Sequence, residues 1–193
     1  MRVAQHPFLI LRATTASLLL WLVLLPAATA ALADEAIPHR VLVGLNLFPN
    51  ILSVTKGGAA DQPQSDAYLL LLVYQNNSSR AEKLASKLRK STKKINRRQV
   101  IVEAVAMDVL AQRQGIGLFL TEKIDDAALQ EVSRIAVDRG ALLFSSFEGD
   151  VEAGAMVGLD VRAKIRPFLN LSSLDRAGLE INAVLKRMSR TVE

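Results

Sequence analysis

Short apolar runs alternate with helical periodicity along most of this chain. Predominantly apolar runs of strand length occur at residues 67–74, 100–105, 116–120 and 141–146, and the run at 67–74 is apolar throughout. Runs of this kind are typical of strands that are covered on both faces of a sheet. Apolar residues spaced by three and four predict amphipathic helices over 79–95 and 125–136. Strands that alternate with helices in this order indicate a sheet with helices packed across it.

Boundary residues support the two helices. Ser79 and Glu82 form a capping-box pattern at the start of the first helix. Asp125 or Asp126 can begin the second helix, and Gly140 is placed to end it.

An earlier helix is expected over Ala36 to Ser53, where apolar residues again recur at helical spacing. Phe48-Pro49-Asn50 should end it, because proline removes a backbone donor and clashes with the preceding turn. A strand beginning at 41–43 is the alternative, but the periodicity outlasts that short run. Residues 56–65, with Gly57-Gly58 and Pro63, are expected to form a loop.

The C-terminal quarter has the pattern of a hairpin followed by a helix. Met156–Leu159 and Ile165–Leu171 are the two expected strands, and Pro167 favours a place at a sheet edge. Ser172 or Ser173 can then cap a helix. The apolar stripe of that helix would be Leu174, Ala177, Ile181, Val184, Leu185 and Met188. The predicted fold is therefore α/β: a single-domain mixed β-sheet packed by helices, with a C-terminal β-hairpin and a final helix.

The first 33 residues have the pattern of an export signal. Arg2 and Arg12 give a positive start, residues 18–25 form an apolar core, and small-x-small cleavage patterns end at Ala30 and Ala33. An uncleaved membrane anchor is the alternative. We expect a signal peptide at 1–33 and one exported, periplasmic domain at 34–193, which is long enough to bury a core.

Composition narrows the chemistry. The chain has no cysteine, which excludes a thiol redox sensor and a cysteine nucleophile. Loss of the signal arginines lowers the formal net charge from +5 to +3. The mature chain is lopsided, because nine of its lysines and arginines fall within residues 80–98 with only Glu82 opposing them.

No catalytic, cofactor or metal site is predicted. His39 is the sole histidine after the signal, and it is expected to be solvated. The Gly115-Ile116-Gly117 fragment enters a strand, so a bulge or close backbone approach explains it better than a nucleotide loop. Asp125-Asp126 is explained by helix capping. The acidic residues at 148, 150 and 152 are expected to form a solvated loop, since their spacing lacks the features of a calcium loop.

The basic segment offers the clearest candidate for an interaction. Its exposed face could contact an acidic protein partner or an anionic envelope surface, although a plain solvated helix face is the simpler reading. Nucleic acid is disfavoured, because no aromatic residues are interleaved for base stacking. The candidate contact residues are Lys83, Lys87, Lys90 and Lys94.

The C-terminal quarter also carries a family resemblance. Its order is Gly-Ala-Met-Val-Gly-Leu at 154–159, Arg-Pro-Phe-Leu-Asn-Leu at 166–171, and Ala-Gly-Leu-x-Ile followed by Leu-Lys at 177–186. This order resembles the C-terminal signature of the YfiR family, the YfiR/HmsC-like periplasmic regulators of Gram-negative bacteria. Within the signature, structural roles are expected for Phe168, Asn170, Gly178 and Leu179.

The resemblance implies a function that the residues alone do not name. Members of this family bind the periplasmic sensor part of an inner-membrane diguanylate cyclase and hold it inactive, which lowers cyclic-di-GMP signalling and biofilm formation. A homodimer is compatible with the resemblance. Redox gating cannot be carried over without cysteines, and Pro167 and Leu169 depart from the family pattern. The alternatives are regulation of a sensor kinase and binding of a small periplasmic anion.

Overall fold

The computed structural model describes residues 36–61, 66–162 and 164–193. The signal peptide expected at 1–33 lies outside the described residues. Within them, eight strands form one mixed sheet in the order β10-β8-β7-β6-β5-β2-β4-β3, and the α/β fold class is confirmed.

The centre of the sheet is parallel. It is formed by β2 (Ala67–Tyr74), β4 (Arg98–Ala106), β5 (Gly117–Leu120) and β6 (Leu142–Phe144). The expected hairpin follows as β7 (Val157–Val161) and β8 (Ile165–Asn170), which pair antiparallel. The edges are β10 (Arg190–Val192), parallel to β8, and β3 (Lys94–Ile95), antiparallel to β4.

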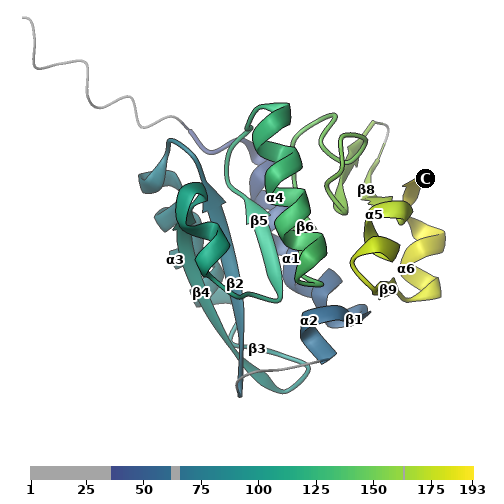
Figure 1. Cartoon of the computed structure of the whole chain (residues 1–193), viewed down its shortest axis with the longest axis horizontal. Coiled ribbons are helices and arrows are strands. Elements are labelled where there is room, and N and C mark those ends of the chain that lie inside the picture. Colours follow the sequence, from purple (N-terminus) through teal and green to yellow (C-terminus); the bar gives the residue numbers. More distant parts are fainter. Residues whose placement is uncertain (1–35, 62–65, 163) are drawn as a thin grey trace, which may run out of the picture. The chain divides into compact units, whose positions relative to one another are not determined.

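Helices cover both faces of the sheet. In Figure 1, α4 (Asp126–Asp138) lies in front of the strands and α1 (His39–Val54) lies behind them. Three buried rings, Phe48 of α1, Phe119 of β5 and Phe144 of β6, join α1 to the sheet with centroids 5.4 to 5.9 Å apart. Gly117 permits this close packing, since a Cβ there would lie 2.7 Å from the Phe48 ring.

The predicted end of the first helix is wrong. α1 continues through Pro49 to Val54. Ile51 and Leu52, in the turn after the proline, are 2% and 4% exposed. Burial of each contributes about 1.5 to 3 kcal/mol, which offsets the roughly 3 kcal/mol that a proline costs inside a helix.

Part of the loop expected at 56–65 is also ordered into regular structure. Its first residues belong to β1 (Thr55–Gly57) and α2 (Gly58–Asp61). β1 pairs with a C-terminal strand in a separate two-stranded sheet. Residues 62–65 lie outside the described part of the chain.

The basic segment is shorter as a helix than the sequence suggested. α3 (Ser78–Ser91) is capped by Asn77, whose Oδ1 accepts from the backbone N–H of Arg80 at 2.8 Å, so Ser79 is not the N-cap. The chain then forms β3 and turns into β4 through Asn96 and Arg97, with φ of 50° and 72°. A helix cannot pass through two residues of positive φ.

The single final helix is wrong as well. α5 (Leu171–Arg176) is followed by β9 (Leu179–Ile181), α6 (Ala183–Met188) and β10. Gly178, with φ of 64°, turns the chain out of α5. Leu179 and Ile181 are then buried by the pairing of β9 with β1. One continuous helix and the observed series of α5, β9 and α6 can bury the same apolar residues. The pairing of β9 with the distant β1 decides between them.

Candidate functional site

The crevice at the carboxyl ends of β2 and β5 is where a doubly wound sheet usually binds its ligand. The chain leaves β2 for β4 on one side and returns to β5 on the other side. Such a switch in strand order leaves a crevice between the two connections. The residues that follow β2 and β5 therefore meet here.

A side chain of the protein itself occupies this position. The backbone N–H groups of Gln75, Asn76 and Asn77 donate to Oε1 of Glu122 at 2.7, 2.6 and 3.1 Å. Successive amides before a helix form a cradle that suits an anion. Because the Glu122 carboxylate takes that place, the cradle is satisfied from within.

Thr121 closes the floor of the same crevice. Its backbone N–H and its hydroxyl both donate to the carbonyl of Val73, at 3.0 and 2.9 Å. The residue is fully buried. Strands β2 and β5 are thus tied together where a ligand would otherwise enter.

A buried carboxylate lies beside this crevice. Asp150 is fully buried, so the expectation of a solvated acidic loop is wrong for this residue, while Glu148 and Glu152 are exposed. Lys123 and the Ser145 hydroxyl both contact the Asp150 carboxylate. A buried charge needs such partners, and they fix the loop after β6.

These polar residues were missed by the sequence reasoning. Thr121, Glu122 and Lys123 come directly after a fully apolar strand. Polar residues directly after a buried strand are a signal for a functional site. The sequence did not show, however, that β2 lies beside β5, so the amides after β2 were not recognised as their partners.

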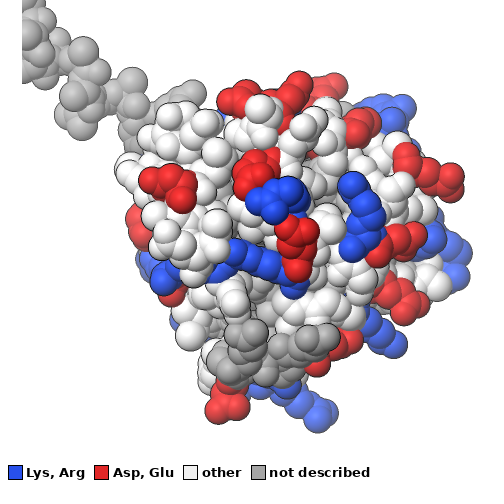
Figure 2. All heavy atoms as spheres, in the orientation of Figure 1, with Lys and Arg blue, Asp and Glu red and all other residues white. Residues whose placement is uncertain are grey.

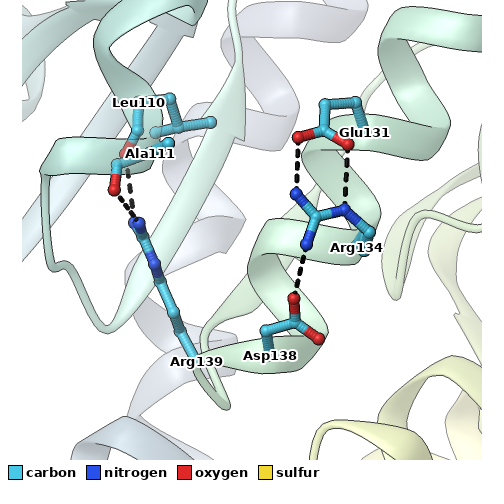
Figure 3. Close-up of polar contacts among 6 residues, drawn as sticks. All are labelled: Leu110, Ala111, Glu131, Arg134, Asp138 and Arg139. Atoms are coloured by element: carbon cyan, nitrogen blue, oxygen red, sulfur yellow. Dashed lines mark hydrogen bonds and ion pairs between the residues drawn. The ribbon is translucent and has the colours of Figure 1, made fainter.

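A cavity lies at the opposite end of the strands. It has a volume of about 570 Å³ and is lined by residues that include Tyr68, Gly115, Arg139 and Arg176. Arg139 donates to the carbonyls of Leu110 and Ala111 at 3.1 and 2.6 Å (Figure 3). Its guanidinium is thus committed to fastening the short helix η1 (Met107–Gln112), and it does not support binding of a small anion.

The outer face of α4 carries an ion-pair ladder. Arg134 donates to Glu131 at 2.7 and 2.9 Å and to Asp138 at 2.7 Å (Figure 3). The hydrogen bond from Arg134 lowers the pKa of Glu131. Figure 2 shows acidic and basic side chains interspersed on this face, which gives no single-sign surface for steering a ligand.

The predicted basic residues fall on two elements. Lys83, Lys87 and Lys90 are exposed on α3 at helical spacing that places them on one side, and Lys94 is exposed on β3. The segment is thus a basic helix followed by a basic hairpin. His39 is exposed at the start of α1.

The signature residues lie around the last strands. Asn170 caps α5 by accepting from the backbone N–H of Ser173 at 2.9 Å, and its amide donates to the Val151 carbonyl at 2.8 Å. Phe168 is 3% exposed beneath the Arg190 guanidinium, which lies 4.1 Å from the ring centroid. Gly178 supplies the positive φ described above, and Leu179 is buried in β9.

A second buried carboxylate joins the last strands. Asp160 of β7 is 5% exposed and accepts from the Nε atoms of Arg162 and Arg166 at 2.8 and 2.9 Å. Arg190 of β10 lies 3.8 Å away. The hydrogen bond from Arg162, followed by the one from Arg166, lowers the pKa of Asp160 despite the opposing effect of desolvation. This cluster fastens β10 to the hairpin.

The described residues contain no group of three or more histidine, aspartate or glutamate side chains that could hold a metal ion. None of the helices in the described ranges is long and apolar enough to cross a bilayer.

Comparison with family models identifies the class of protein. The YfiR/HmsC-like family model matches residues 48–190, which is well over half of the chain. The chain therefore belongs to the YfiR/HmsC-like family, as its C-terminal signature suggested. Members of this family are periplasmic and regulatory rather than catalytic. Comparison with curated proteins gives no significant match.

Solved structures share the fold at low identity. A conserved domain protein of Vibrio cholerae has a TM-score of 0.53 at 15% identity, with 79% of this chain and 60% of that chain covered. The ABC domain of a Streptococcus pneumonia protein in complex with L-Trp has a TM-score of 0.52 at 10% identity, with 77% and 60% covered. The substrate-binding protein CD0873 of Clostridium difficile has a TM-score of 0.50 at 14% identity, with 78% and 58% covered. The chain spans about three fifths of each of these proteins.

Proposed function

We propose that this protein is a periplasmic regulator that binds the periplasmic sensor part of an inner-membrane diguanylate cyclase and represses it. Repression would lower cyclic-di-GMP signalling and biofilm formation. The family match over residues 48–190 is the observation that carries this proposal. The nucleotide itself is made on the other side of the membrane, so the protein acts by protein contact.

The sealed crevice supports action by protein contact over solute binding. Two of the similar structures are titled as a complex with L-Trp and as a substrate-binding protein. In this chain, the Glu122 carboxylate accepts the amide hydrogen bonds at the switch point, and Thr121 joins β5 to β2 there. A ligand there would have to displace hydrogen bonds that are already made, which costs affinity.

The basic residues are the proposed contact surface for the partner. Lys83, Lys87, Lys90 and Lys94 are proposed to face an acidic patch on the sensor part. The variant Lys87→Gln should weaken partner binding and flatten its salt dependence. Lys56→Gln, which removes the same charge at another exposed lysine outside this segment, is the matched control. Equal loss of partner affinity in both variants would contradict the proposal.

A genetic experiment tests the function directly. Deletion of the gene in its native host should raise cellular cyclic-di-GMP and biofilm mass, and the exported protein should restore both. The same protein without residues 1–33 should fail to restore them, because it would stay in the cytoplasm.

Unchanged cyclic-di-GMP after both deletion and overproduction would overturn the proposal. A changed phosphorylation output at constant cyclic-di-GMP would point instead to a sensor kinase as the partner. Size-exclusion chromatography with light scattering, run on the purified protein, would establish whether it forms a homodimer.

A further inference from the structure

The helix α6 has an apolar side that the described part of the chain does not bury. None of its six residues is buried, and Val184 and Met188 are 56% and 66% exposed. Exposed apolar side chains of this size are ordinary when scattered singly, but a contiguous group marks an interaction site.

The apolar side of α6 forms one wall of a groove. The groove has a volume of about 270 Å³, and the opposite wall is α1. Its lining is apolar apart from Asn50 and Asn182, and includes Ile51 of α1, Pro167 of β8, and Val184 and Met188 of α6. This volume is below the roughly 300–1,000 Å³ of pockets that enclose small ligands, so it suits side chains of a partner better than a metabolite.

The apolar surface continues from the groove along the hairpin. Ile165 lies two residues before Pro167 on β8 and is therefore on the same face. Val161 of β7 pairs directly with Ile165, and each is 48% exposed. The exposed apolar strip thus extends beyond the groove towards the end of the hairpin.

The elements that form the groove carry positive charge only. α1, β8 and α6 contain no acidic residue. α6 contributes Lys186 and Arg187, both exposed, and Lys164 is exposed just before β8. No ion pair is recorded for these three cations within the described residues. Charge complementarity therefore favours an occupant with acidic residues beside its apolar side.

The geometry points to a helix as the occupant. The walls are side chains of α1 and α6, and β8 contributes Pro167, which has no N–H to offer a partner strand. We propose that the groove between α1 and α6 binds an amphipathic helix with acidic residues flanking its apolar ridge. The assignment of this helix to a membrane signalling protein rests on the proposed function. The preference for an acidic amphipathic helix rests on the groove alone.

A synthetic peptide of about 20 residues, long enough to hold helical structure, is the probe. It carries leucines at i, i+3, i+4 and i+7 with glutamates on both flanks. A second peptide keeps the leucines and replaces each glutamate by lysine. Titration calorimetry on the purified exported protein should show that the acidic peptide binds. The basic peptide should bind with a dissociation constant at least about tenfold higher.

Variants of the protein locate the binding. Met188→Asp places a charge in the groove at an exposed position and should weaken the acidic peptide about tenfold or more. Val109→Asp is the matched control, because Val109 is 40% exposed on η1 (Met107–Gln112), outside the groove lining. It should bind as the unmodified protein does. Unfolding midpoints of both variants confirm that they are folded.

Three results would overturn the inference. They are equal binding of the two peptides, equal binding to Met188→Asp and the unmodified protein, and a concentration-dependent dimer that Met188→Asp dissolves while no peptide binds. The last result would assign the groove to a second copy of the chain.

The two proposals fail in distinguishable ways. If gene deletion raises cyclic-di-GMP and the Met188→Asp protein still represses it fully, the function stands and the groove is not its contact surface. If the acidic peptide binds in the groove while deletion leaves cyclic-di-GMP unchanged, the groove stands and the proposed function falls.

Discussion

The carboxyl ends of β2 and β5, called the carboxyl edge below, differ from the groove between α1 and α6 in whether the protein's own residues satisfy the groups there. At the carboxyl edge, Glu122 caps three amides and Asp150 is held by Lys123 and Ser145. At the groove, Val184 and Met188 remain exposed, and no element among the described residues covers them. One region satisfies its own polar groups, and the other leaves its apolar groups to be covered.

This difference separates stability from interaction. Substitutions at the carboxyl edge should remove contacts that the fold itself uses, and they should therefore destabilise it. Substitutions in the groove should leave the fold intact and change only what binds there. The predictions below test this separation, beginning with the largest expected effect.

Loss of the cation at the buried pair should have the largest effect. Lys123→Met keeps most of the side-chain stem but leaves the fully buried Asp150 without its cation. Because Lys123 is 48% exposed and Asp150 keeps the Ser145 hydroxyl, we expect a loss of about 2 kcal/mol in the free energy of unfolding, which is less than a fully buried pair loses with one partner. Urea denaturation measures it. Arg134→Met, in an exposed pair on α4, is the control and should cost at most about 0.5 kcal/mol. Equal losses would show that burial does not set the cost.

Removal of the internal cap should have a smaller effect. Glu122→Ala leaves three backbone N–H groups without their acceptor. Because Gln75 and Asn76 are exposed and water can replace the carboxylate there, we expect a loss of about 1 kcal/mol. Glu122→Gln keeps an acceptor oxygen and should lose less. A glutamine variant that is as unstable as the alanine variant would contradict the capping role, and chemical denaturation of both measures the difference.

The Asp160 cluster should make a contribution that depends on pH. Its arginine partners lower the pKa of Asp160 in the folded state, so its stabilisation is present above the unfolded pKa of about 4. It is lost as pH falls through the lowered folded pKa. Asp160→Asn should therefore lose less stability than the unmodified protein as pH falls below about 4. Denaturation series from neutral to acid pH measure this, and parallel profiles would contradict it.

The groove substitution should have the smallest effect on stability. Met188 is 66% exposed, so Met188→Asp should change the free energy of unfolding by about 0.5 kcal/mol or less. The same variant should lose binding of the acidic peptide. Thermal unfolding followed by circular dichroism checks the first part. A large destabilisation would mean that α6 contributes to the core, and the contrast between the two regions would disappear.

The hydrophobic pattern predicted the structure correctly where only one type of element could bury the apolar residues. The fully apolar run at 67–74 became β2 with the expected bounds, and Asp125 caps α4 by accepting from the Ala128 N–H at 2.8 Å. The pattern failed where two structures bury the same residues. Ile181 fits a helical stripe and a strand equally, and pairing with Thr55 of β1 places it in a strand.

The sequence by itself determined the α/β class, the strands and helices of the central sheet, and the family signature at the C-terminus. Hydrophobic periodicity and capping act over a few residues, so they can be read locally. Only the tertiary structure decided that Glu122 would meet the amides before α3, about 45 residues away, and that α6 would lie beside α1 without cover from the described residues. The first depends on strand order, and the second depends on the break in the last helix at Gly178. Both bring together segments that are distant in the sequence, so local periodicity does not report them.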